Sequence, residues 1–594
     1  MPEFKIKLKK LLFFSEPEKD EGFILKENLY DKSEEERNRQ DIENNSDKKP
    51  SPKSTRNENI LYNKQKGEEL DGKNVDKSQK DDKQNKGQKP EISKKLSDNL
   101  EYMKKVYTIP INGDVILREF DITIKDDTIE AFIIFFDGMV DRKLINEAIL
   151  QPLMLLSNLD IKGKFDDIAS YISKHLLPQN QLKVVNGYKE LIGEVNFGGC
   201  GIFIDGVSIA FTADVKGWEH RNVERPNTEL VIRGPQEGFT EVLRVNTALI
   251  RKILKDEDFI VENMEIGRRS KTPCSLLYIK DIANDSLVNE ARRRLKSLKV
   301  DYIIDSGELE QLIEDNTYLP IPQIIDTERP DKVASLLTEG KVGVLVHGSP
   351  YALVMPATLT GLLHSPEDSY IRFPYSNFLR FIRVMAILLT LLLPGLYLAI
   401  TNFHPEMIPT DLLLAIEASR EKVPFPSVVE VLMLEISFEL IREAGIRIPG
   451  PIGPTLGIIG ALILGQAAVA ANIVSPILII IVAVTGIGSF AIPTFSLAFS
   501  FRLLRFGYII LGAMAGFLGI TTGLFIQGII LVNSKSFGIP LLIPFGPRTK
   551  GAATDEIIRA PIWKQERRPD SLNTKDDKKQ PHISRRWVIK KRGE

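Results

Sequence analysis

The chain has 594 residues, which is too long for one ordinary domain. Its formal net charge of -1 indicates no partner by bulk charge, and we predict no nucleic-acid partner. Two cysteines, Cys200 and Cys274, provide neither a disulfide framework nor a zinc site, so we expect unpaired thiols in a reducing compartment. The mean hydropathy of -0.08 averages two opposite parts, because residues 15–98 are poor in large apolar residues and residues 381–546 are rich in them.

Residues 1–98 are predicted to be a disordered, charged tract. Segments such as KSEEERNRQDIENNSDKKPSPKSTRNE bury too little apolar surface to offset the entropy of ordering, so we interpret the tract as a solvated linker, with an interaction tail as the alternative. The beginning, MPEFKIKLKKLLFF, has an apolar stretch too short for a signal peptide. Its lysine cluster is either a frayed terminus or a contact with anionic membrane lipids.

Residues 99–235 and 236–365 are predicted to form two soluble subdomains, the first α+β and the second α/β. In the first, DVILREF and AFIIFF are typical of strands, MVDRKLINEAILQPLMLL of a helix, and GIFIDGVSIAF of a hairpin that turns at Asp205-Gly206. In the second, CSLLYI, VDYIID and KVGVLVHGSPYALVM predict strands, while SLVNEARRRLKSL and SGELEQLIED predict helices. The strand–helix–strand order indicates some parallel pairing.

Neither subdomain carries an enzyme signature. GGCGIF lacks both the P-loop Lys-Ser/Thr pair and the dinucleotide-binding spacing, and none of the six histidines forms a metal pair at helical spacing. We therefore expect no catalytic residue, no metal and no cofactor. The segment His347-Gly348-Ser349-Pro350 is interpreted as a tight turn between strands; a nucleophilic Ser349 is the alternative, but it lacks the usual strand-to-helix context.

Residues 378–534 predict an all-α polytopic membrane domain with about four to five hydrophobic helices. The stretch 381–401 has the ~20 residues that cross a bilayer, and the apolar block 455–490 predicts a helical hairpin broken at NIVSP. Segment 507–532 predicts a last crossing, which returns the basic tail, residues 535–594, to the cytoplasmic side of the soluble region. A crossing by 427–445 would change this count unless one segment is re-entrant, so its role stays open.

Small residues recur every four positions in these predicted helices. Such spacing lets transmembrane helices approach closely, and it favours a packed bundle or an oligomer over a single anchor, although membrane helices are generally rich in Gly and Ala. The positions expected to mediate packing are Gly457, Ala461, Gly465, Gly512, Gly516, Gly519 and Gly523.

Charges interrupt the apolar region in the stretch FELIREAGIRIPG and just before it. On a helix over 427–444, Glu435, Glu439, Arg442 and Glu443 fall within roughly a quarter to a third of the circumference. Three interpretations remain: an amphipathic helix lying in the membrane interface, internal pairing of these charges, or a face that lines a water-filled pathway.

Six long segments in the same order carry a family resemblance: DGMVDRKLINEAIL (137–150), RGPQEGFTEVLRVNTALIRK (233–252), TERPDKVASLLTEGKVGVLVHGSPYALVMPATL (327–359), FHPEMIPTDLLLAI (403–416), VPFPSVVEVLMLEISFELIREAGIRIPGPIG (423–453) and GQAAVAANIVSPILIIIVAVTGI (465–487). Over about residues 100 to 565 the chain resembles the A subunit of the GerA-type spore germination receptors. The charged tract 15–98 lies outside the resemblance.

The resemblance implies a subunit in the inner membrane of dormant spores, with its N-terminal domain in the cytoplasm. It implies a transporter-like B subunit that binds the nutrient, a lipoprotein C subunit, and self-association into a nutrient-gated cation channel. It favours Glu435, Glu439, Arg442 and Glu443 as pore-lining or gating residues. The alternatives are a membrane-anchored scaffold or ligand-binding subunit without its own pore, and a secondary transporter, against which the absence of an evident internal repeat argues.

Overall fold

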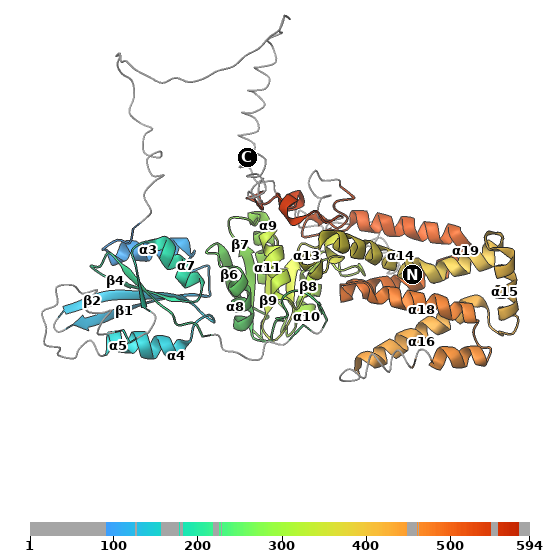
Figure 1. The fold of residues 1–594 in the computed structure, drawn as a ribbon, viewed down its shortest axis with the longest axis horizontal. Helices are drawn as coiled ribbons and strands as arrows, with labels where there is room; N and C mark the ends of the chain where they lie inside the picture. The colour runs from blue at the N-terminus through green and yellow to red at the C-terminus, as the bar shows by residue number, and fades with distance from the viewer. Residues whose placement is uncertain are drawn as a thin grey trace, which may run out of the picture.

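The computed structural model describes residues 91–124, 127–155, 177–178, 182–217, 225–226, 228–447, 460, 463–547, 556 and 558–580. Figure 1 shows three units in chain order along its long axis: two subdomains that each contain a β-sheet, and then a bundle of helices. The predicted disordered tract and its lysine cluster lie outside the described residues up to residue 90. Residues 91–98, however, belong to subdomain 1, since Ile92 is buried and Glu91 forms a β-bridge with Gly187.

Subdomain 1 contains a five-stranded sheet in the order β1-β2-β4-β5-β3, in which every pair is antiparallel. Its strands are β1 (Val115–Ile124), β2 (Asp127–Phe136), β3 (Leu182–Val185), β4 (Cys200–Ile204) and β5 (Ala210–Ala213). Apolar clusters lie on both faces, and β2, β4 and β5 accordingly bury consecutive residues and not alternate ones. One face is covered by α3 (Leu96–Val106) and α7 (Tyr188–Asn196), the other by α4 (Arg142–Ile145), η2 (Asn146–Leu150) and α5 (Gln151–Met154).

Subdomain 2 repeats this topology. Its sheet order is β6-β7-β9-β10-β8, again with antiparallel pairs only, and its helices follow the same positions along the chain as those of subdomain 1. The strands are β6 (Phe259–Ile266), β7 (Thr272–Ile279), β8 (Ile325–Thr327), β9 (Val342–Val346) and β10 (Ala352–Met355). The helices are α8 (Leu243–Ile253), α9 (Asp285–Ser297), α10 (Ser306–Ile313) and α11 (Pro330–Thr338).

Two predictions for this region are wrong. The expected parallel pairing does not occur among the described strands, because β8 lies at the sheet edge and pairs antiparallel with β10. The segment VDYIID (300–305) is not a strand; it is an irregular connection that ends in Asp305, whose side chain caps α10 by accepting a hydrogen bond from the Gly307 amide.

The hairpin expected from GIFIDGVSIAF is confirmed as β4 and β5. Its connection is longer than a two-residue turn, because Ile202 pairs with Phe211 in the ladder. Asp205 instead accepts a hydrogen bond from the Leu96 amide at 2.9 Å, which attaches α3 to the sheet.

A buried ion pair joins the two subdomains. Arg251 of α8 donates to both carboxylate oxygens of Asp114, at 2.5 and 2.9 Å, and its guanidinium lies 4.0 Å from the ring centroid of Phe136. Next to this pair, the Gly113 amide of subdomain 1 donates a hydrogen bond to the Val261 carbonyl of subdomain 2 at 2.8 Å, so the backbones of the two subdomains are also in contact. Both charged side chains are almost fully buried, so this pair is a buried polar link between the subdomains.

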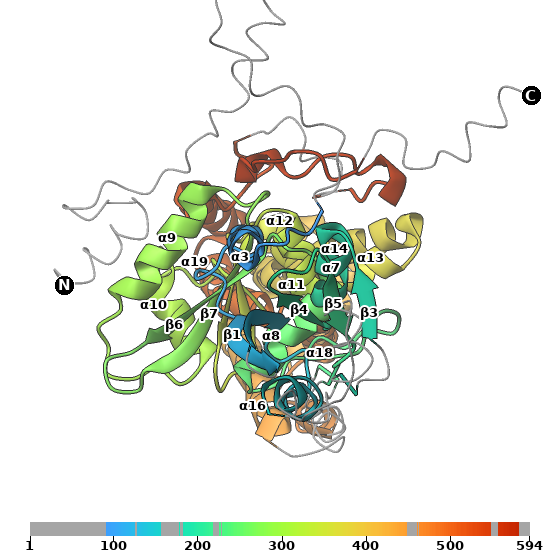
Figure 2. The same ribbon diagram turned by 90° about the vertical axis from the view of Figure 1, so that its left-hand side faces the viewer.

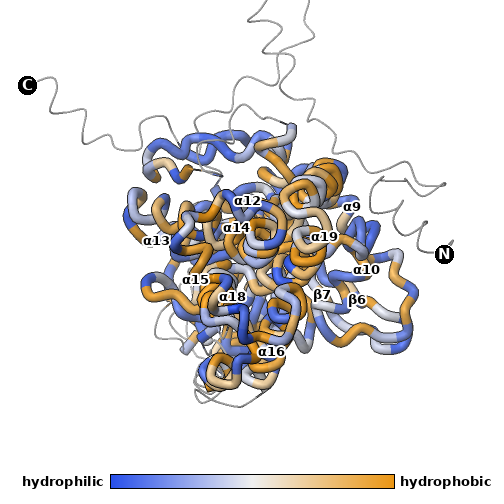
Figure 3. The backbone as a smooth tube through the Cα atoms, turned by 90° about the vertical axis from the view of Figure 1, so that its right-hand side faces the viewer, coloured by the Kyte–Doolittle hydropathy of each residue, from blue (hydrophilic) through white to orange (hydrophobic). Residues whose placement is uncertain are grey.

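The third unit is a bundle of apolar helices, and Figure 3 shows its hydrophobic colouring along α14, α18 and α19. Two of the described helices, α14 and α19, are long and apolar enough to cross a membrane. A helical segment over 463–470 precedes α18, and the break expected at NIVSP is present, since Asn472 has a positive φ and α18 begins at Pro476. The helices are α12 (Leu359–Leu362), α13 (Glu367–Tyr370), α14 (Phe373–Phe403), η5 (Pro405–Met407), α15 (Thr410–Arg420), α16 (Ser427–Arg447), α18 (Pro476–Phe490) and α19 (Phe495–Asn533).

The last apolar block folds back on itself, which corrects the prediction of a single crossing. Gly516 has φ 58° and ψ -136°, so α19 consists of two arms that meet at this residue. The Tyr508 hydroxyl of the first arm hydrogen-bonds the Gln527 side chain of the second. In a straight helix of 39 residues, which would be roughly 58 Å long, these two side chains would be too far apart to meet. The turn needs a backbone conformation that only glycine adopts without strain.

Both ends of α19 contact the same part of subdomain 2. Ser496 Oγ donates to Asp326 at 3.0 Å, and Ser536 Oγ, just beyond the second arm, donates to the Gln323 carbonyl at 2.5 Å. The turn at Gly516 lies beside Phe403, at the distal end of α14. Helix α19 therefore both begins and ends at subdomain 2.

The basic tail predicted for residues 535–594 begins with a short sheet, β11 (Lys535–Ser536) and β12 (Ile539–Pro540), and continues as a segment, residues 556–580, that packs on subdomain 2. Figure 2 shows this C-terminal segment along one side of subdomain 2, between α9 and α13. It contains η7 (Ile562–Lys564) and η8 (Asp570–Leu572). Lys575 bonds Asp285 of α9 at 2.6 Å, and Arg559 donates to the Ser369 carbonyl of α13 at 3.0 Å.

Candidate functional site in the helical region

Helix α16 turns most of its charged side chains toward the interior of the bundle, with Glu443 as an exception. Ser427, Val431, Leu434 and Glu435 are buried, and their spacing of three or four residues places them on one face. The opposite face is apolar and exposed, at Val429, Ile436 and Leu440. This arrangement is the reverse of that in a helix of a water-soluble protein, and it suits a helix surrounded by lipid or by other apolar helices.

The carboxylates of this face form ion pairs with the first arm of α19. Arg505 lies 2.8 Å from Glu435 and 3.0 Å from Glu439, and Arg502 lies 2.8 Å from the other oxygen of Glu439. Glu435 and Arg505 are fully buried, whereas the Glu439 side chain keeps 27% of its exposure. The contact of Glu435 is an ion pair without hydrogen-bond alignment, since neither of its oxygens has a hydrogen bond to the described residues.

Arg442 connects this cluster to α18. It lies 3.9 Å from Glu439, donates to the Ser489 hydroxyl at 2.7 Å, and its guanidinium is 4.5 Å from the ring centroid of Phe490. We call the five side chains Glu435, Glu439, Arg442, Arg502 and Arg505 the charged cluster. With two carboxylates and three guanidiniums it carries one excess positive charge, and it joins α16, α18 and α19.

Burying this many charges is costly unless they neutralise one another. A buried ion pair gains Coulomb energy that offsets its desolvation, but removal of one partner leaves an uncompensated charge and typically costs about 3–5 kcal/mol. The charged cluster therefore holds the three helices in one register, because a helix cannot slide or rotate without separating opposite charges.

Two other acidic residues of α16 lie outside the charged cluster. Glu443 is exposed. It lies one helical turn beyond Glu439, beside the exposed apolar face of Val429, Ile436 and Leu440. Glu430 is buried near the start of the helix, where it accepts a hydrogen bond from the Ser475 amide at 3.1 Å and lies 3.9 Å from Arg420. The structure thus brings three of the four predicted site residues together and leaves Glu443 at their edge.

The predicted small residues occupy several different positions. Gly512 lies where α19 crosses α14, since a Cβ at this position would be 2.5 Å from the Gly395 carbonyl oxygen. Gly519 and Gly523 face Leu511, within the hairpin of α19, and Gly465 faces Ile479 of α18. Gly516 forms the turn itself, and Gly457 and Ala461 lie outside the described residues.

Arg502 and Arg505 are the residues of the candidate site that sequence reasoning missed. Their spacing of three residues places both on one helix face, opposite in sign to the acidic pair of α16, and this was the available signal.

The alternative nucleophile, Ser349, lies in a structural hydrogen-bond network. Its hydroxyl is completely buried, donates to Asp305 at 2.6 Å and lies 2.9 Å from the Ser306 hydroxyl. The described part of the chain contains no group of three His, Cys, Asp or Glu side chains that is suited to a metal ion.

Comparison with known proteins gives consistent matches over most of the chain. A family model described as Bacillus/Clostridium GerA spore germination protein matches residues 101–571. Spore germination protein KA of Bacillus subtilis is 38% identical over 84% of this chain and 92% of its own length. Spore germination protein B1 of the same organism is 37% identical over 82% of this chain and 100% of its own length.

Among solved structures, the chain is similar to the N-terminal domain of the A subunit of the Bacillus megaterium spore germinant receptor GerK3. The match has 31% sequence identity and a TM-score of 0.35, and it covers 46% of this chain and 98% of that chain.

Proposed function

This chain belongs to the GerA family of spore germination proteins, the A subunits of germinant receptors, and we propose that it oligomerises into a nutrient-gated cation channel of the spore inner membrane. Members of this family are not enzymes. In the proposal, a transporter-like B subunit that binds the nutrient and a lipoprotein C subunit are its partners, and the two soluble subdomains lie in the cytoplasm.

The charged cluster is the observation that carries the proposal. Charges at membrane depth are expensive and are kept where they serve a pathway or an assembly. Glu439 lies at the boundary between the buried and the exposed face of α16, and Glu443 follows it on the exposed side. We propose that this boundary borders the ion pathway in the oligomer, where two carboxylates per subunit attract cations.

Glu435 and Arg505 take a different part in this proposal. Both are fully buried, so they hold α16 against α19 and contact no ion directly. Arg442 extends the same attachment to α18 through Ser489. A gating movement of α16 would have to separate these ion pairs. The free energy that this separation costs would disfavour intermediate positions of α16, so the helix would switch between a closed and an open state.

The outer surface of the bundle supports association with lipid or with other copies. Large apolar side chains are about 70% exposed on two helices, α18 and α19, in the single chain. The close approach at Gly512 and within the α19 hairpin keeps each subunit compact, which is the role we propose for the small residues. The most exposed of these apolar side chains are Ile487, Phe490, Met514, Leu518 and Phe525.

A scaffold or ligand-binding subunit without its own pore is the second candidate. The observation that favours it is the charge balance of the cluster, because Glu435 and Glu439 already have arginine partners within one chain. A carboxylate that is neutralised by a neighbouring guanidinium attracts a cation weakly.

Ion flux from liposomes distinguishes the two candidates. The purified chain, with and without its B and C subunits, would be reconstituted in potassium-loaded vesicles, and its oligomeric state measured in parallel. We expect potassium release that falls several-fold in Glu439→Gln with the oligomer unchanged. Glu421→Gln, an exposed carboxylate between α15 and α16, is the matched control and should release potassium like the native chain. Intact oligomers of the complete receptor that release no potassium would establish the scaffold.

A further inference from the structure

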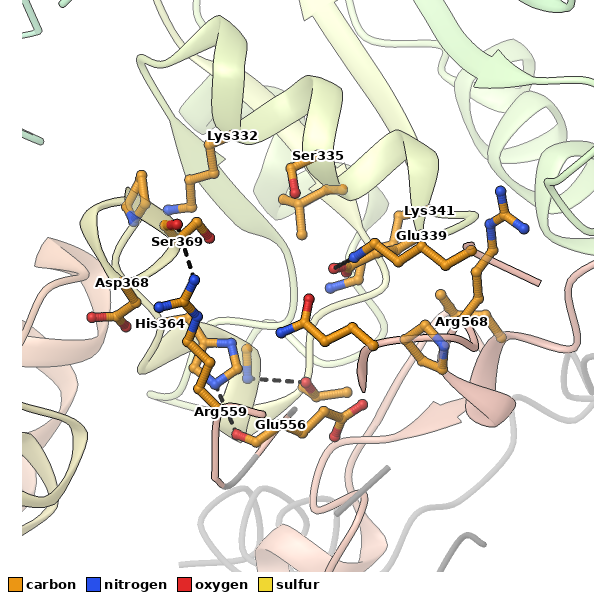
Figure 4. A pocket seen from close by; sticks show the side chains of 18 of the residues that line it. Lys332, Ser335, Glu339, Lys341, His364, Asp368, Ser369, Glu556, Arg559 and Arg568 are labelled. Carbon is orange, nitrogen blue, oxygen red and sulfur yellow. Dashed lines mark hydrogen bonds and ion pairs between the residues drawn. The ribbon is translucent and has the colours of Figure 1, made fainter. Parts of the chain in front are cut away.

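A cavity of about 640 Å3 lies between subdomain 2, the beginning of α14 and the C-terminal segment, away from the charged cluster. Figure 4 shows Lys332 and Lys341 on one side of it, and His364, Glu556 and Arg559 on the other. The C-terminal segment closes this second side, because His364 Nε2 lies 2.8 Å from the Glu556 carbonyl oxygen and Arg559 is held by backbone carbonyls of α13 and the residue after it.

The lining of the cavity is predominantly positive. Eight basic and five acidic side chains line it. Four of the basic ones form ion pairs, namely Lys332, Arg380, Arg568 and Lys579, and most of the acidic ones are engaged as well. The ion pairs that occupy them are Asp331 with Arg329, Asp368 with Arg383, and Glu339 with Lys579.

Lys341 is a buried basic residue of this lining whose charge is only partly offset, by the carboxylates of Glu339 and Glu556. Its side chain is buried with 6% exposure and lines the cavity, and no hydrogen bond or ion pair from the described residues reaches its ammonium group. A buried, unpaired ammonium group is unfavourable, and burial lowers the pKa of Lys341 for this reason. An anion in the cavity would remove this cost.

We propose that this cavity binds a phosphate-bearing anion, with Lys341 as its central charge partner and Lys564 at its exposed rim. A phosphate group presents three strong acceptor oxygens, which suits basic groups that approach from several elements, and the volume lies within the range of small-molecule sites, roughly 300–1,000 Å3. The bound anion would link the C-terminal segment to subdomain 2, because residues of both line the cavity.

Two sources offer this chemistry. Arg380 near the start of α14 also lines the cavity, so the head group of an anionic phospholipid is one source, and a free phosphate compound of the cytoplasm is the other. The proposal concerns the phosphate group that both share.

The test measures the thermal unfolding midpoint of the delipidated full-length protein in a neutral detergent. Inorganic phosphate is titrated in one arm at constant ionic strength, and short-chain phosphatidylglycerol is titrated in the other, with phosphatidylcholine as the comparison. The variants are Lys341→Gln, Lys341→Arg and the rim variant Lys564→Gln. Lys296→Gln, an exposed lysine of α9, is the control.

We expect saturable stabilisation of the native protein by phosphate, by phosphatidylglycerol or by both, and the arm that responds identifies the source. In Lys341→Gln the apparent affinity should fall about tenfold or more, as expected for a lost charge-assisted hydrogen bond, while Lys341→Arg and Lys296→Gln retain binding. Without ligand, Lys341→Gln should unfold at a higher temperature than the native protein, since it removes an unpaired buried charge.

A native protein that responds to neither probe would overturn the proposal, as would equal responses of the native protein and Lys341→Gln. If Lys341→Gln does not fold, Lys564→Gln decides the question, because its exposed position does not affect folding. Unchanged affinity in that variant would remove the proposed rim contact and contradict the site as described.

Discussion

In subdomain 1 both faces of the sheet are covered by its own helices, whereas in subdomain 2 one face shares its apolar core with the membrane helices. The core between α8, α11 and the second sheet continues through Leu497 and Phe501 into α19. Strand β8 and the residues just before it receive both ends of α19, through Asp326 and Gln323 respectively. The same arrangement of strands and helices is thus a separate unit in one case and the base of the helical bundle in the other.

The difference shows that topology alone does not assign a role to a subdomain. Subdomain 2 is distinguished by the polar groups at its edge strand β8. The short helix α13, which follows subdomain 2, adds Asp368, which pairs with Arg383 of α14 at 2.5 Å. Subdomain 1 contacts subdomain 2 through the buried pair of Asp114 and Arg251 and through a second pair, Asp137 with Arg244 at 2.9 Å. A movement of subdomain 1 would therefore be passed to subdomain 2, which contacts α14 and α19.

The largest expected effect comes from breaking the link between the two subdomains. Arg251→Ala leaves Asp114 buried without its partner, which should cost about 3–5 kcal/mol at this interface. The amide of Gly113, bonded to Val261 across the interface, should then exchange its hydrogen roughly two to four orders of magnitude faster, at about 1.36 kcal/mol per tenfold.

Hydrogen exchange measured by mass spectrometry on the full-length protein provides this comparison. Arg268→Ala is the control, because its pair with Asp301 is exposed and is expected to contribute less than about 1 kcal/mol. Unchanged exchange at Gly113 in Arg251→Ala would mean that the buried pair does not hold the subdomains together.

The next effect concerns the turn at Gly516, which brings the second arm of α19 back to subdomain 2. Gly516→Ala places a Cβ at positive φ and within 3.0 Å of Phe403, and the strained backbone should cost about 1–3 kcal/mol. The midpoint of thermal unfolding in detergent should fall. Gly528→Ala, in the second arm of α19, adds a Cβ in open space and should leave the midpoint unchanged. Equal midpoints for the two variants would contradict a turn at Gly516.

A smaller effect is the pH dependence of folding stability, which we expect to differ between the two subdomains. Burial and the neighbouring carboxylates of Asp326 and Glu314 raise the pKa of Glu310 in α10 to about 8. The folded state then binds this proton more tightly than the unfolded chain does, so the stabilisation is complete below pH 4.5 and is lost as the pH rises to about 8.

Glu310→Gln should therefore leave stability unchanged near pH 5 and raise it near pH 9, by roughly 1–2 kcal/mol after allowance for the partial exposure of this side chain. Unfolding midpoints across this range measure the effect. Glu147→Gln, at an exposed position in the corresponding helix of subdomain 1, should follow the native profile throughout. A Glu310→Gln profile parallel to that of the native protein would rule out the raised pKa.

The local elements of both sheets were predictable because they depend on local patterns. The run AFIIFF is rich in β-branched and aromatic residues, CSLLYI is rich in large apolar ones, and they form β2 and β7. VDYIID is also rich in β-branched and aromatic residues, but the cap that Asp305 provides for α10 takes precedence over a strand. The shared topology of the two subdomains was not predicted, since strand order depends on pairings between segments that no local pattern specifies.

Of the charged cluster, the part that lies on α16 was predictable, because it depends on a local pattern, and the part that lies on α19 was not. Helical periodicity placed Glu435, Glu439 and Arg442 on one face, and the structure brings them together. Their partners Arg502 and Arg505 are more than 60 residues further along the chain, and only the packing of α16 against α19 unites them. Gly516 looked like one more small residue in a membrane helix, because glycine at a turn and glycine at a helix contact have the same sequence signature.

The central claim is that Glu439 and Glu443, at the boundary between the buried and the exposed face of α16, border a cation pathway. Its most direct test is the reversal potential of the reconstituted receptor in a planar bilayer under a potassium chloride gradient, for the native chain and for Glu439→Gln with Glu443→Gln. We predict a reversal potential close to that of potassium for the native receptor and a clear shift toward zero for the double variant. Identical reversal potentials for the two proteins would contradict the claim and place these carboxylates outside the pathway.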